Sequence, residues 1–187
     1  MDAKKPSYLG LLNAIALGEG RAHQYLSCWA AKTTDPDVKK VLQTVAIREG
    51  EHSHAFTKRL CELGYGVLDR PDPSLEKNLA IANADCSDLE KFEALGFGKR
   101  EERDPFTSVF DDLSIDIRTG ELLGRYIAEE RDSGRLLRGC YQALRERAGR
   151  GRVAETPSRD LGELHHRLDE ICAAIGKLQQ EVTALRR

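Results

Sequence analysis

The feature that most constrains the fold is an apolar stripe over residues 38–56 that two polar residues interrupt. At alternating spacings of three and four, one helix places six residues on one face: Val38, Leu42, Val45, Glu49, His52 and Phe56. A carboxylate in an apolar face is unfavourable unless a partner compensates it, so Glu49 and His52 need partners in the core. Because these two residues lie three apart, their side chains point the same way from adjacent turns. They could therefore bind one metal ion together.

A second interrupted stripe precedes the first. The spacing predicts a helix from Tyr8 to Lys32, with Ser7 as its cap. Its apolar face consists of Leu12, Ile15, Glu19, Ala22, Leu26 and Trp29. A single glutamate, Glu19, breaks this face, so the two predicted helices share the same unusual pattern.

The turn between these helices provides a geometric test. Residues 33–37 contain Pro36, which suits the first turn of a helix, and a threonine or an aspartate can cap there. Position 34 lies midway between positions 19 and 49 in the chain. An antiparallel hairpin therefore brings Glu19 and Glu49 to the same height. We predict that Glu19, Glu49 and His52 converge on one metal site.

The second helix is expected to end near residues 63–66, where two glycines stop it. Residues 65–104 form a crossover insert that is too long for a plain loop, so we expect short helices over 74–83 and 87–95. A third long helix is predicted over residues 105–147, with an interruption near residues 119–120.

The third helix has two possible apolar faces, and each contains one acidic residue. One face runs through Leu123, Ile127, Glu130, Gly134, Leu137, Tyr141 and Leu144, and the other through Leu122, Tyr126, Glu129, Ser133, Leu136 and Cys140. Helix propensity does not distinguish them. We favour Glu130 as the metal ligand because its distance from the helix end resembles that of Glu19, and Glu129 stays the alternative.

The C-terminal segment carries a heptad pattern. Residues 148–157 are rich in glycine and arginine and predict a connection, after which a helix is expected over 158–187. This last helix contains Glu163 and His166 at the spacing of Glu49 and His52. The pair lies beside the apolar face and near the helix start, which argues against a ligand role, yet Glu163 and His166 stay candidate metal ligands. The heptad face could close the bundle or form a coiled coil between two chains.

Composition narrows the classes of function. The formal net charge is −2, which gives no electrostatic basis for binding nucleic acid. No apolar run is long enough to cross a membrane, and the polar N-terminus shows no signal peptide, so we expect a cytoplasmic protein. The five cysteines form no Cys-x-x-Cys pair, which predicts mostly buried thiols and no thiolate metal site.

Three stretches within residues 8–60 carry a resemblance to a known family. They are Glu19-Gly20-Arg21-Ala22-His23-Gln24-Tyr25, Asp35-Pro36-Asp37-Val38-Lys39-Lys40-Val41-Leu42 and Glu49-Gly50-Glu51-His52. These stretches resemble the ferritin-like superfamily, in particular the rubrerythrin branch and the encapsulated ferritins. The resemblance implies an all-α fold, a four-helix bundle formed by a single domain over residues 1–187. Its parts would be a helical hairpin over 8–64, the crossover insert, the third helix and the C-terminal helix.

The same resemblance implies a di-iron carboxylate centre. Glu49 would bridge the metal ions, Glu19 and His52 would be terminal ligands, and Glu130 would be the carboxylate from the third helix. Iron is the expected cofactor, with manganese as an alternative. The chain lacks the two Cys-x-x-Cys pairs of a rubredoxin domain. Encapsulated ferritins share their site between two subunits, and we likewise expect a homodimer or a higher homo-oligomer.

Two functional interpretations follow. The first is an oxidoreductase that oxidises Fe(II) or reduces dioxygen or peroxide. The second is a structural or interaction protein with the ferritin fold and an incomplete metal site. Tyr25 and Tyr126 are candidates to support the metal ligands through hydrogen bonds, although we favour the interpretation that they are ordinary core aromatics. Glu51 and His54 are expected to be solvent-exposed. Without metal, we expect the clustered carboxylates to raise one another's pKa values.

Overall fold

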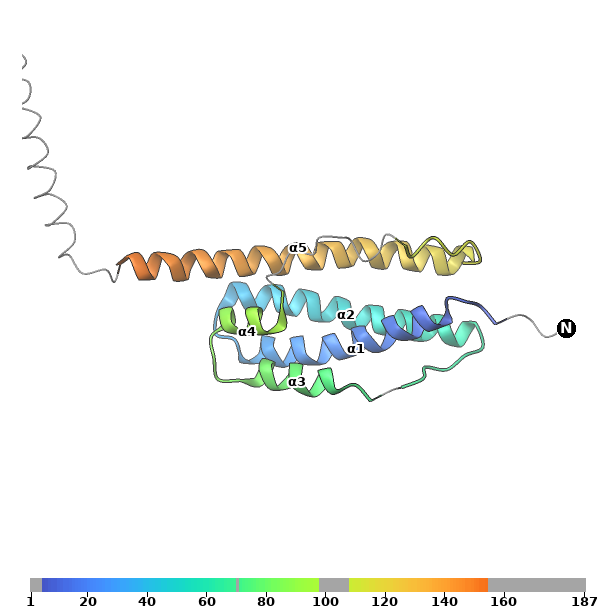
Figure 1. Cartoon of the computed structure of the whole chain (residues 1–187), viewed down its shortest axis with the longest axis horizontal. Coiled ribbons are helices and arrows are strands. Elements are labelled where there is room, and N and C mark those ends of the chain that lie inside the picture. Colours follow the sequence, from blue (N-terminus) through green and yellow to red (C-terminus); the bar gives the residue numbers. More distant parts are fainter. Residues whose placement is uncertain (1–4, 70, 98–107, 155–187) are drawn as a thin grey trace, which may run out of the picture. The chain divides into compact units, whose positions relative to one another are not determined.

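The computed structural model describes residues 5–69, 71–97 and 108–154 (Figure 1). Within these ranges the chain forms five helices and no strand, which confirms the all-α prediction. The helices are α1 (Leu9–Lys32), α2 (Pro36–Glu62), α3 (Pro73–Asn83), α4 (Asp88–Leu95) and α5 (Ile117–Ala154). None of the described helices is both long enough and apolar enough to cross a membrane.

The hairpin of α1 and α2 forms as the sequence predicts. Asp35 caps α2 because its Oδ1 accepts hydrogen bonds from the backbone N–H groups of Asp37 and Val38, at 2.9 and 3.2 Å. The Ser53 hydroxyl donates to the Ala16 carbonyl oxygen over 2.8 Å, as expected for antiparallel helices joined near residue 34.

The predicted cap of α1 is wrong. The residue before the helix is Tyr8, which makes no side-chain capping bond, whereas the Ser7 hydroxyl donates to the carboxylate of Asp112. The Ser7 hydroxyl, which the local sequence predicts to cap α1, therefore bonds Asp112, a residue far away in the sequence.

The predicted short helices of the crossover insert are confirmed as α3 and α4. Gly64 follows α2 with a φ of 83°, a left-handed conformation that glycine adopts without steric cost. Ser87 and Glu90 form a reciprocal capping box at the start of α4. The Asp88 carboxylate then accepts hydrogen bonds from Trp29 Nε1 and the Thr33 hydroxyl, both at 2.6 Å, which joins α4 to the end of α1.

The third long helix differs from its prediction at both ends. It begins at Ile117, continues without a break through residues 119–120, and extends to Ala154 through most of the predicted connection. Residues 108–116 are not helical, and residues 98–107 lie outside the described part. Thr119 is completely buried, and its hydroxyl donates to Asp116 over 2.7 Å while it accepts from Arg59 over 2.9 Å. These bonds hold the first turn of α5 where propensity predicted an interruption.

The side-chain contacts fix the direction of α5. Arg59 contacts Asp116 and His52 contacts Glu129, so α5 runs antiparallel to α2. The Tyr126 hydroxyl bonds Glu19, and Tyr8 bonds Asp116, so α5 runs parallel to α1. A single long crossover, as in ferritin-like bundles, would leave the second and third helices parallel. The described part is therefore three long helices packed together, and a ferritin-like four-helix bundle stays a prediction.

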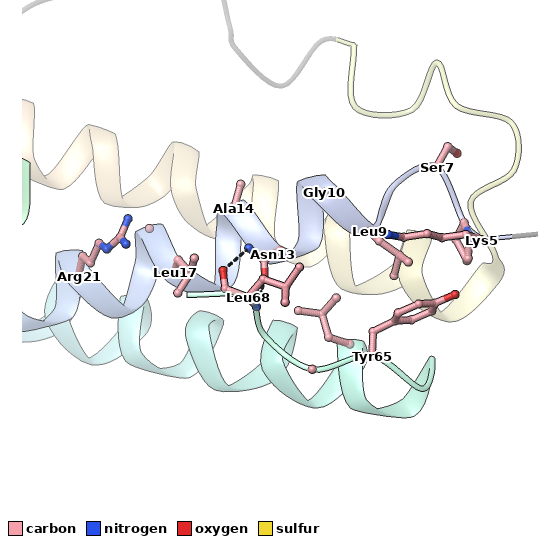
Figure 2. A pocket seen from close by; sticks show the side chains of 14 residues that line it. Lys5, Ser7, Leu9, Gly10, Asn13, Ala14, Leu17, Arg21, Tyr65 and Leu68 are labelled. Atoms are coloured by element: carbon pink, nitrogen blue, oxygen red, sulfur yellow. Dashed lines mark hydrogen bonds between the residues drawn. The ribbon is translucent and has the colours of Figure 1, made fainter. Parts of the chain in front are cut away.

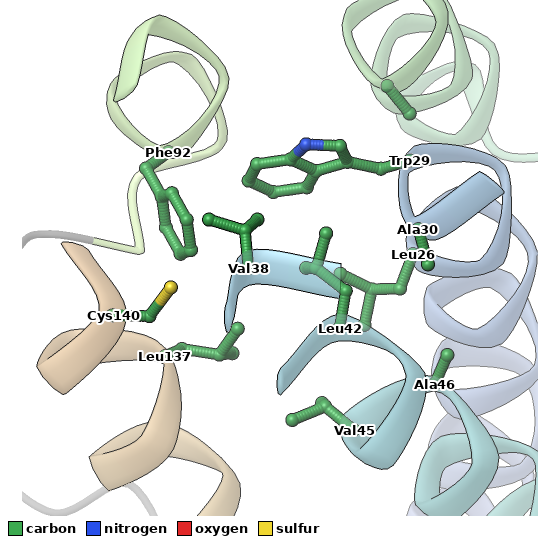
Figure 3. Close-up of a cluster of buried hydrophobic side chains, with 11 residues drawn as sticks. Leu26, Trp29, Ala30, Val38, Leu42, Val45, Ala46, Phe92, Leu137 and Cys140 are labelled. Carbon is green, nitrogen blue, oxygen red and sulfur yellow. The ribbon is translucent and has the colours of Figure 1, made fainter. Parts of the chain in front are cut away.

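Two apolar clusters fill the space between these helices. In one, Trp29 packs edge-on against Phe92 with ring centroids 4.7 Å apart, and Val38, Leu137 and Cys140 complete the contact (Figure 3). In the other, Phe56 and Leu123 are completely buried and pack with residues from α1. Glu19 and His52 lie between the two clusters along α1 and α2. The core therefore excludes water on both sides of the interrupted stripes.

The chain divides into two compact units, residues 1–145 and 146–187. The single domain over 1–187 stays a prediction, as does the helix over 158–187, which lies outside the described residues together with Cys172. The expectation of mostly buried thiols is wrong for the four described cysteines, because Cys61 and Cys86 are exposed and just Cys140 is buried.

Candidate metal centre

Four side chains from three helices converge between the two apolar clusters. Glu19 comes from α1, Glu49 and His52 come from α2, and Glu130 comes from α5. One ligand atom from each lies within 4.8 Å of the corresponding atoms of the other three. The predicted convergence of Glu19, Glu49 and His52 is therefore observed, and Glu130 joins them. A metal ion at this cluster stays a prediction.

The cluster contains polar atoms that are buried and unsatisfied. Glu19, Glu49 and His52 are 8%, 5% and 4% exposed. Glu19 Oε2, His52 Nδ1 and Glu130 Oε1 have no solvent contact and no hydrogen-bond partner. His52 Nδ1 lies 3.5 Å from Glu19 Oε2 and 3.4 Å from Glu130 Oε1. A buried polar atom without a partner costs about 1–3 kcal/mol, and a bound ion at such a point removes that cost.

Tyr126 holds Glu19 in place. Its hydroxyl donates a hydrogen bond of 2.9 Å to Glu19 Oε1, which leaves Oε2 directed at the cluster. The favoured interpretation of Tyr126 as an ordinary core aromatic is therefore wrong, and the alternative, a residue that hydrogen-bonds a candidate ligand, is the one observed. Tyr25 packs against the Trp29 cluster, and burial followed by the nearby carboxylates raises the pKa of its hydroxyl.

His52 is contacted on both ring nitrogens. Nδ1 faces the cluster, while Nε2 lies 2.8 Å from Glu129 Oε2. The other oxygen of Glu129 accepts a 2.9 Å hydrogen bond from Arg125 Nε. The favoured residue, Glu130, is thus the one in the cluster, and the alternative Glu129 lies against the same imidazole from the other side.

Arg48 joins α2 to α5 next to Glu49. Its guanidinium donates to the Glu129 carbonyl oxygen, the Asp132 carboxylate and the Ser133 hydroxyl, at 3.1, 3.2 and 3.0 Å. Arg48 is not among the site residues that the sequence predicts. Its position directly before Glu49 was the available signal.

The electrostatic environment of the cluster shifts the pKa values of Glu19 and Glu49 in opposite directions. Burial and the neighbouring Glu19 carboxylate raise the pKa of Glu49 to about 11. Burial also acts to raise the pKa of Glu19, but the close approach of His52, Glu49 and Tyr126 outweighs it and lowers that pKa. The expected mutual increase is thus confirmed for Glu49 and wrong for Glu19.

The acidic groups around His52 change the pKa of its imidazole. Burial acts to lower the pKa of the imidazole, but the carboxylates of Glu130, Glu19 and Glu129 raise it to about 10. Near neutral pH the metal-free cluster therefore contains a protonated His52 and a neutral Glu49.

A groove of about 610 Å³ leads from the surface to this site. His52, Tyr126 and Glu129 lie at its inner wall, and Ile47, Ala55 and Leu122 supply much of the apolar lining. Since His52 is almost completely buried, the groove gives its Nε2 side a route toward solvent.

A different groove of about 710 Å³ lies along the outer face of α1 (Figure 2). Lys5, Arg21 and Tyr65 line it, and the side-chain amide of Asn13 is hydrogen-bonded to the backbone of Leu68. This groove is lined by none of the four clustered residues Glu19, Glu49, His52 and Glu130, whereas His52 lines the smaller groove between α2 and α5.

The donor set fits some metals better than others. Three carboxylates and one imidazole suit Fe(II), Fe(III) and Mn(II), whereas copper and zinc sites rely more on thiolate or several imidazoles. Of the other candidates, Glu51 and His54 are exposed as predicted. Glu163 and His166 lie outside the described residues, so their ligand role stays a prediction.

The chain was compared with known proteins in three ways. No family model matches it, and neither does any curated protein or any solved structure. The case for a metal centre therefore depends on the cluster itself.

Proposed function

We propose that this chain binds iron, with manganese as the alternative metal, at Glu19, Glu49, His52 and Glu130. We further propose that it is an oxidoreductase of the di-iron carboxylate type, which oxidises Fe(II) or reduces dioxygen or peroxide. The observation that carries this proposal is the set of three buried atoms without partners, Glu19 Oε2, His52 Nδ1 and Glu130 Oε1, around one point. In the metal-free chain the protonated His52 compensates the Glu19 and Glu130 carboxylates in part, and a metal ion bound by all three atoms would compensate them further.

The residues of the chain would divide the work as follows. Glu19, Glu49, Glu130 and His52 Nδ1 would bind the metal. Tyr126 keeps Glu19 oriented through its hydrogen bond. Bound iron would supply electrons to dioxygen or peroxide. The groove between α2 and α5 would admit these small molecules, while the two apolar clusters keep bulk water from the ligands.

A second candidate function is a structural or interaction protein with an incomplete site. It is favoured by the single imidazole among the four converging ligands, because di-iron bundles commonly use two Glu-x-x-His motifs. Under this alternative the chain binds metal weakly or not at all, and its helices serve assembly.

Metal analysis of the full chain after anaerobic Fe(II) loading separates these functions. The test variant is Glu49→Ala/His52→Ala, and the matched control is Glu51→Ala/His54→Ala, which removes the same residue types at the same spacing from an exposed face. We expect the control to retain iron and the test variant to lose it. About two irons per chain would support a site complete within one chain, and about one would indicate a site shared between two copies. Equal, negligible iron in all three proteins would contradict the proposed function and favour the assembly role.

The reaction itself needs a second measurement. Iron-loaded chain should oxidise added Fe(II), or consume peroxide, faster than the Glu49→Ala/His52→Ala variant under the same conditions. Iron binding without any rate difference between the two proteins would contradict the oxidoreductase part and leave a metal-binding protein.

A further inference from the structure

Glu129 lies next to the metal-binding cluster but is not one of its four residues. Its Oε2 is 2.8 Å from His52 Nε2, and its Oε1 accepts a hydrogen bond from Arg125 Nε over 2.9 Å. These contacts form a chain from an exposed guanidinium, through a half-buried carboxylate, to a buried imidazole. The chain follows the wall of the groove between α2 and α5.

We propose that Glu129 is a positioning residue that orients His52 for metal binding. This inference deepens the proposed function and rests on it. A neutral imidazole carries one hydrogen, and the nitrogen without it is the one that can bind a metal. If Nε2 donates its hydrogen to Glu129, the lone pair lies on Nδ1, which faces Glu19 and Glu130. The opposite tautomer would place a hydrogen in the cluster and block the metal.

The geometry separates this role from that of a simple link between helices. Arg48 already joins α2 to α5 through four hydrogen bonds to the segment 129–133. Arg125, which is 68% exposed in its side chain, fixes Glu129 from the solvent side. Glu129 is thus held in a position from which its free oxygen reaches the imidazole nitrogen that faces away from the cluster.

Outer carboxylates of this kind tune metal affinity. A histidine that binds a metal commonly donates its other N–H to a carboxylate, and loss of that partner weakens metal binding about 10- to 100-fold. We therefore expect Glu129→Ala to weaken binding within this range. Glu129→Gln keeps a hydrogen-bond acceptor without the charge, so its loss should be smaller. Glu51→Gln, which alters an exposed carboxylate lining the same groove, should leave the affinity unchanged.

The experiment uses Co(II) as the probe on the full chain. Its affinity is measured by titration for the unaltered protein and the three variants, and circular dichroism checks that each variant folds. In parallel, proton NMR of the Co(II)-bound protein detects the shifted N–H resonance of the His52 ring. With Glu129 as acceptor this hydrogen exchanges slowly with water and is visible. In Glu129→Ala it faces the groove, and we expect the resonance to disappear while it persists in Glu51→Gln.

The results separate a failure of metal binding at the cluster from a failure of the positioning role of Glu129. If the unaltered chain does not bind Co(II), or the Glu49→Ala/His52→Ala variant binds it equally well, the proposed function itself fails. If binding depends on Glu49 and His52 but both Glu129 variants keep the affinity and the N–H resonance, just the positioning role is overturned. Should Glu129→Ala fail to fold, an unchanged affinity and resonance in Glu129→Gln would overturn it instead.

Discussion

Glu19 and Glu49 lie in the same buried space but hold protons very differently. Tyr126 donates a hydrogen bond to Glu19, and His52 approaches it, so its charge is compensated and its pKa falls. Burial and the nearby Glu19 carboxylate both disfavour the ionised form of Glu49, which raises its pKa to about 11. One proton therefore stays on Glu49 near neutral pH, and it lessens the repulsion between the two carboxyl groups until a metal replaces it.

Glu49→Gln tests this assignment. Glutamine imitates the protonated carboxyl, so we expect the variant to lose metal binding and yet to gain a few kcal/mol in the free energy of unfolding at pH 8, without metal. Chemical denaturation of the chelator-treated proteins measures the change, and Glu51→Gln is the exposed control. A metal-free Glu49→Gln that is clearly less stable than the unaltered chain would contradict a neutral Glu49.

Tyr126→Phe tests the support of Glu19. The change removes just the hydroxyl that donates to Glu19 Oε1 and leaves that buried oxygen without its partner. We expect the free energy of unfolding to fall by about 1–3 kcal/mol in the metal-free protein. The matched control is Tyr65→Phe, because Tyr65 lies on the groove along α1, away from the cluster. Equal effects of the two substitutions would argue against a specific role of the Tyr126 hydroxyl.

At the scale of elements, the position of α5 determines whether the site exists. Besides the contact between His52 and Glu129, two arginines of α2 hold this helix in place. Arg48 bonds residues 129–133, and Arg59 bonds Thr119 and Asp116 at the start of the helix. Because Glu130 lies between these contacts, they fix its height relative to His52.

Arg59→Met should therefore destabilise the chain. Arg59 is 9% exposed, and methionine keeps much of its apolar volume while it removes the hydrogen bond to the Thr119 hydroxyl and the ion pair with Asp116. We expect a loss of about 1–3 kcal/mol in thermal or denaturant unfolding. Lys58→Met, at a neighbouring residue whose ion pair with Glu62 is exposed, should change stability by about 0.5 kcal/mol or less. Similar losses in both variants would show that the Arg59 contacts are no stronger than a surface ion pair.

The helices differ in how well the sequence predicts them. The bounds of α1 and α2 agree closely because local signals coincide: apolar spacing, Asp35 as a cap, and Gly64 after the end. The start of α5 does not agree, although a local signal is present: the Asp116 carboxylate accepts a 3.1 Å hydrogen bond from the backbone N–H of Thr119, as an N-cap does, and Arg59 adds long-range bonds to the same turn. Its continuation past residue 148 shows that arginine and alanine outweigh isolated glycines there.

The choice between Glu129 and Glu130 is a second case in which local sequence signals were not sufficient. Adjacent residues of a helix project about 100° apart, so a ring placed between the two directions is reached by both. The sequence predicted an acidic partner from this helix, but not that each carboxylate takes one nitrogen of His52. Sequence periodicity identifies the face of a helix that is buried. The packing of α5 against α2 determines which carboxylate contacts which nitrogen of His52.

At the scale of the whole molecule, the cluster makes the stability of the metal-free chain depend on pH. Glu49 keeps its proton in the folded state up to about pH 11, against an ordinary value of 4.5, and His52 up to about pH 10, against 6.5. Between pH 6.5 and 10 the folded chain therefore binds more protons than the unfolded chain at both residues. Stability should fall as pH rises, by at most about 1.4 kcal/mol per pH unit for each residue.

Carboxylates with lowered pKa values act in the opposite direction but in another range. Glu19, Glu129 and Asp116 stabilise the folded state while they are ionised, and this contribution is lost in acid, as the pH falls through their folded pKa values. Above pH 6.5 these three carboxylates stay ionised in both states, so the pH dependence of stability there comes from Glu49 and His52. Stability of the metal-free chain should thus be greatest in mildly acidic solution.

Metal binding should remove this dependence above neutral pH, because Glu49 and His52 must give up their protons to bind the metal and then hold none in either the folded or the unfolded state. Uptake of one Co(II) near pH 7 should release about two protons, one from Glu49 and one from His52. A weakly buffered titration with an indicator dye counts them, and melting curves from pH 5 to 10 with and without Co(II) show the change in stability. The melting temperature of the metal-free chain should fall with pH, while the gap between the two curves should widen, since the metal binds more tightly as proton competition weakens. The Glu51→Ala/His54→Ala control should release the same number of protons as the unaltered chain. Release of none, together with a metal-free melting temperature that is flat between pH 6.5 and 10, would show that Glu49 and His52 do not carry the protons assigned to them here.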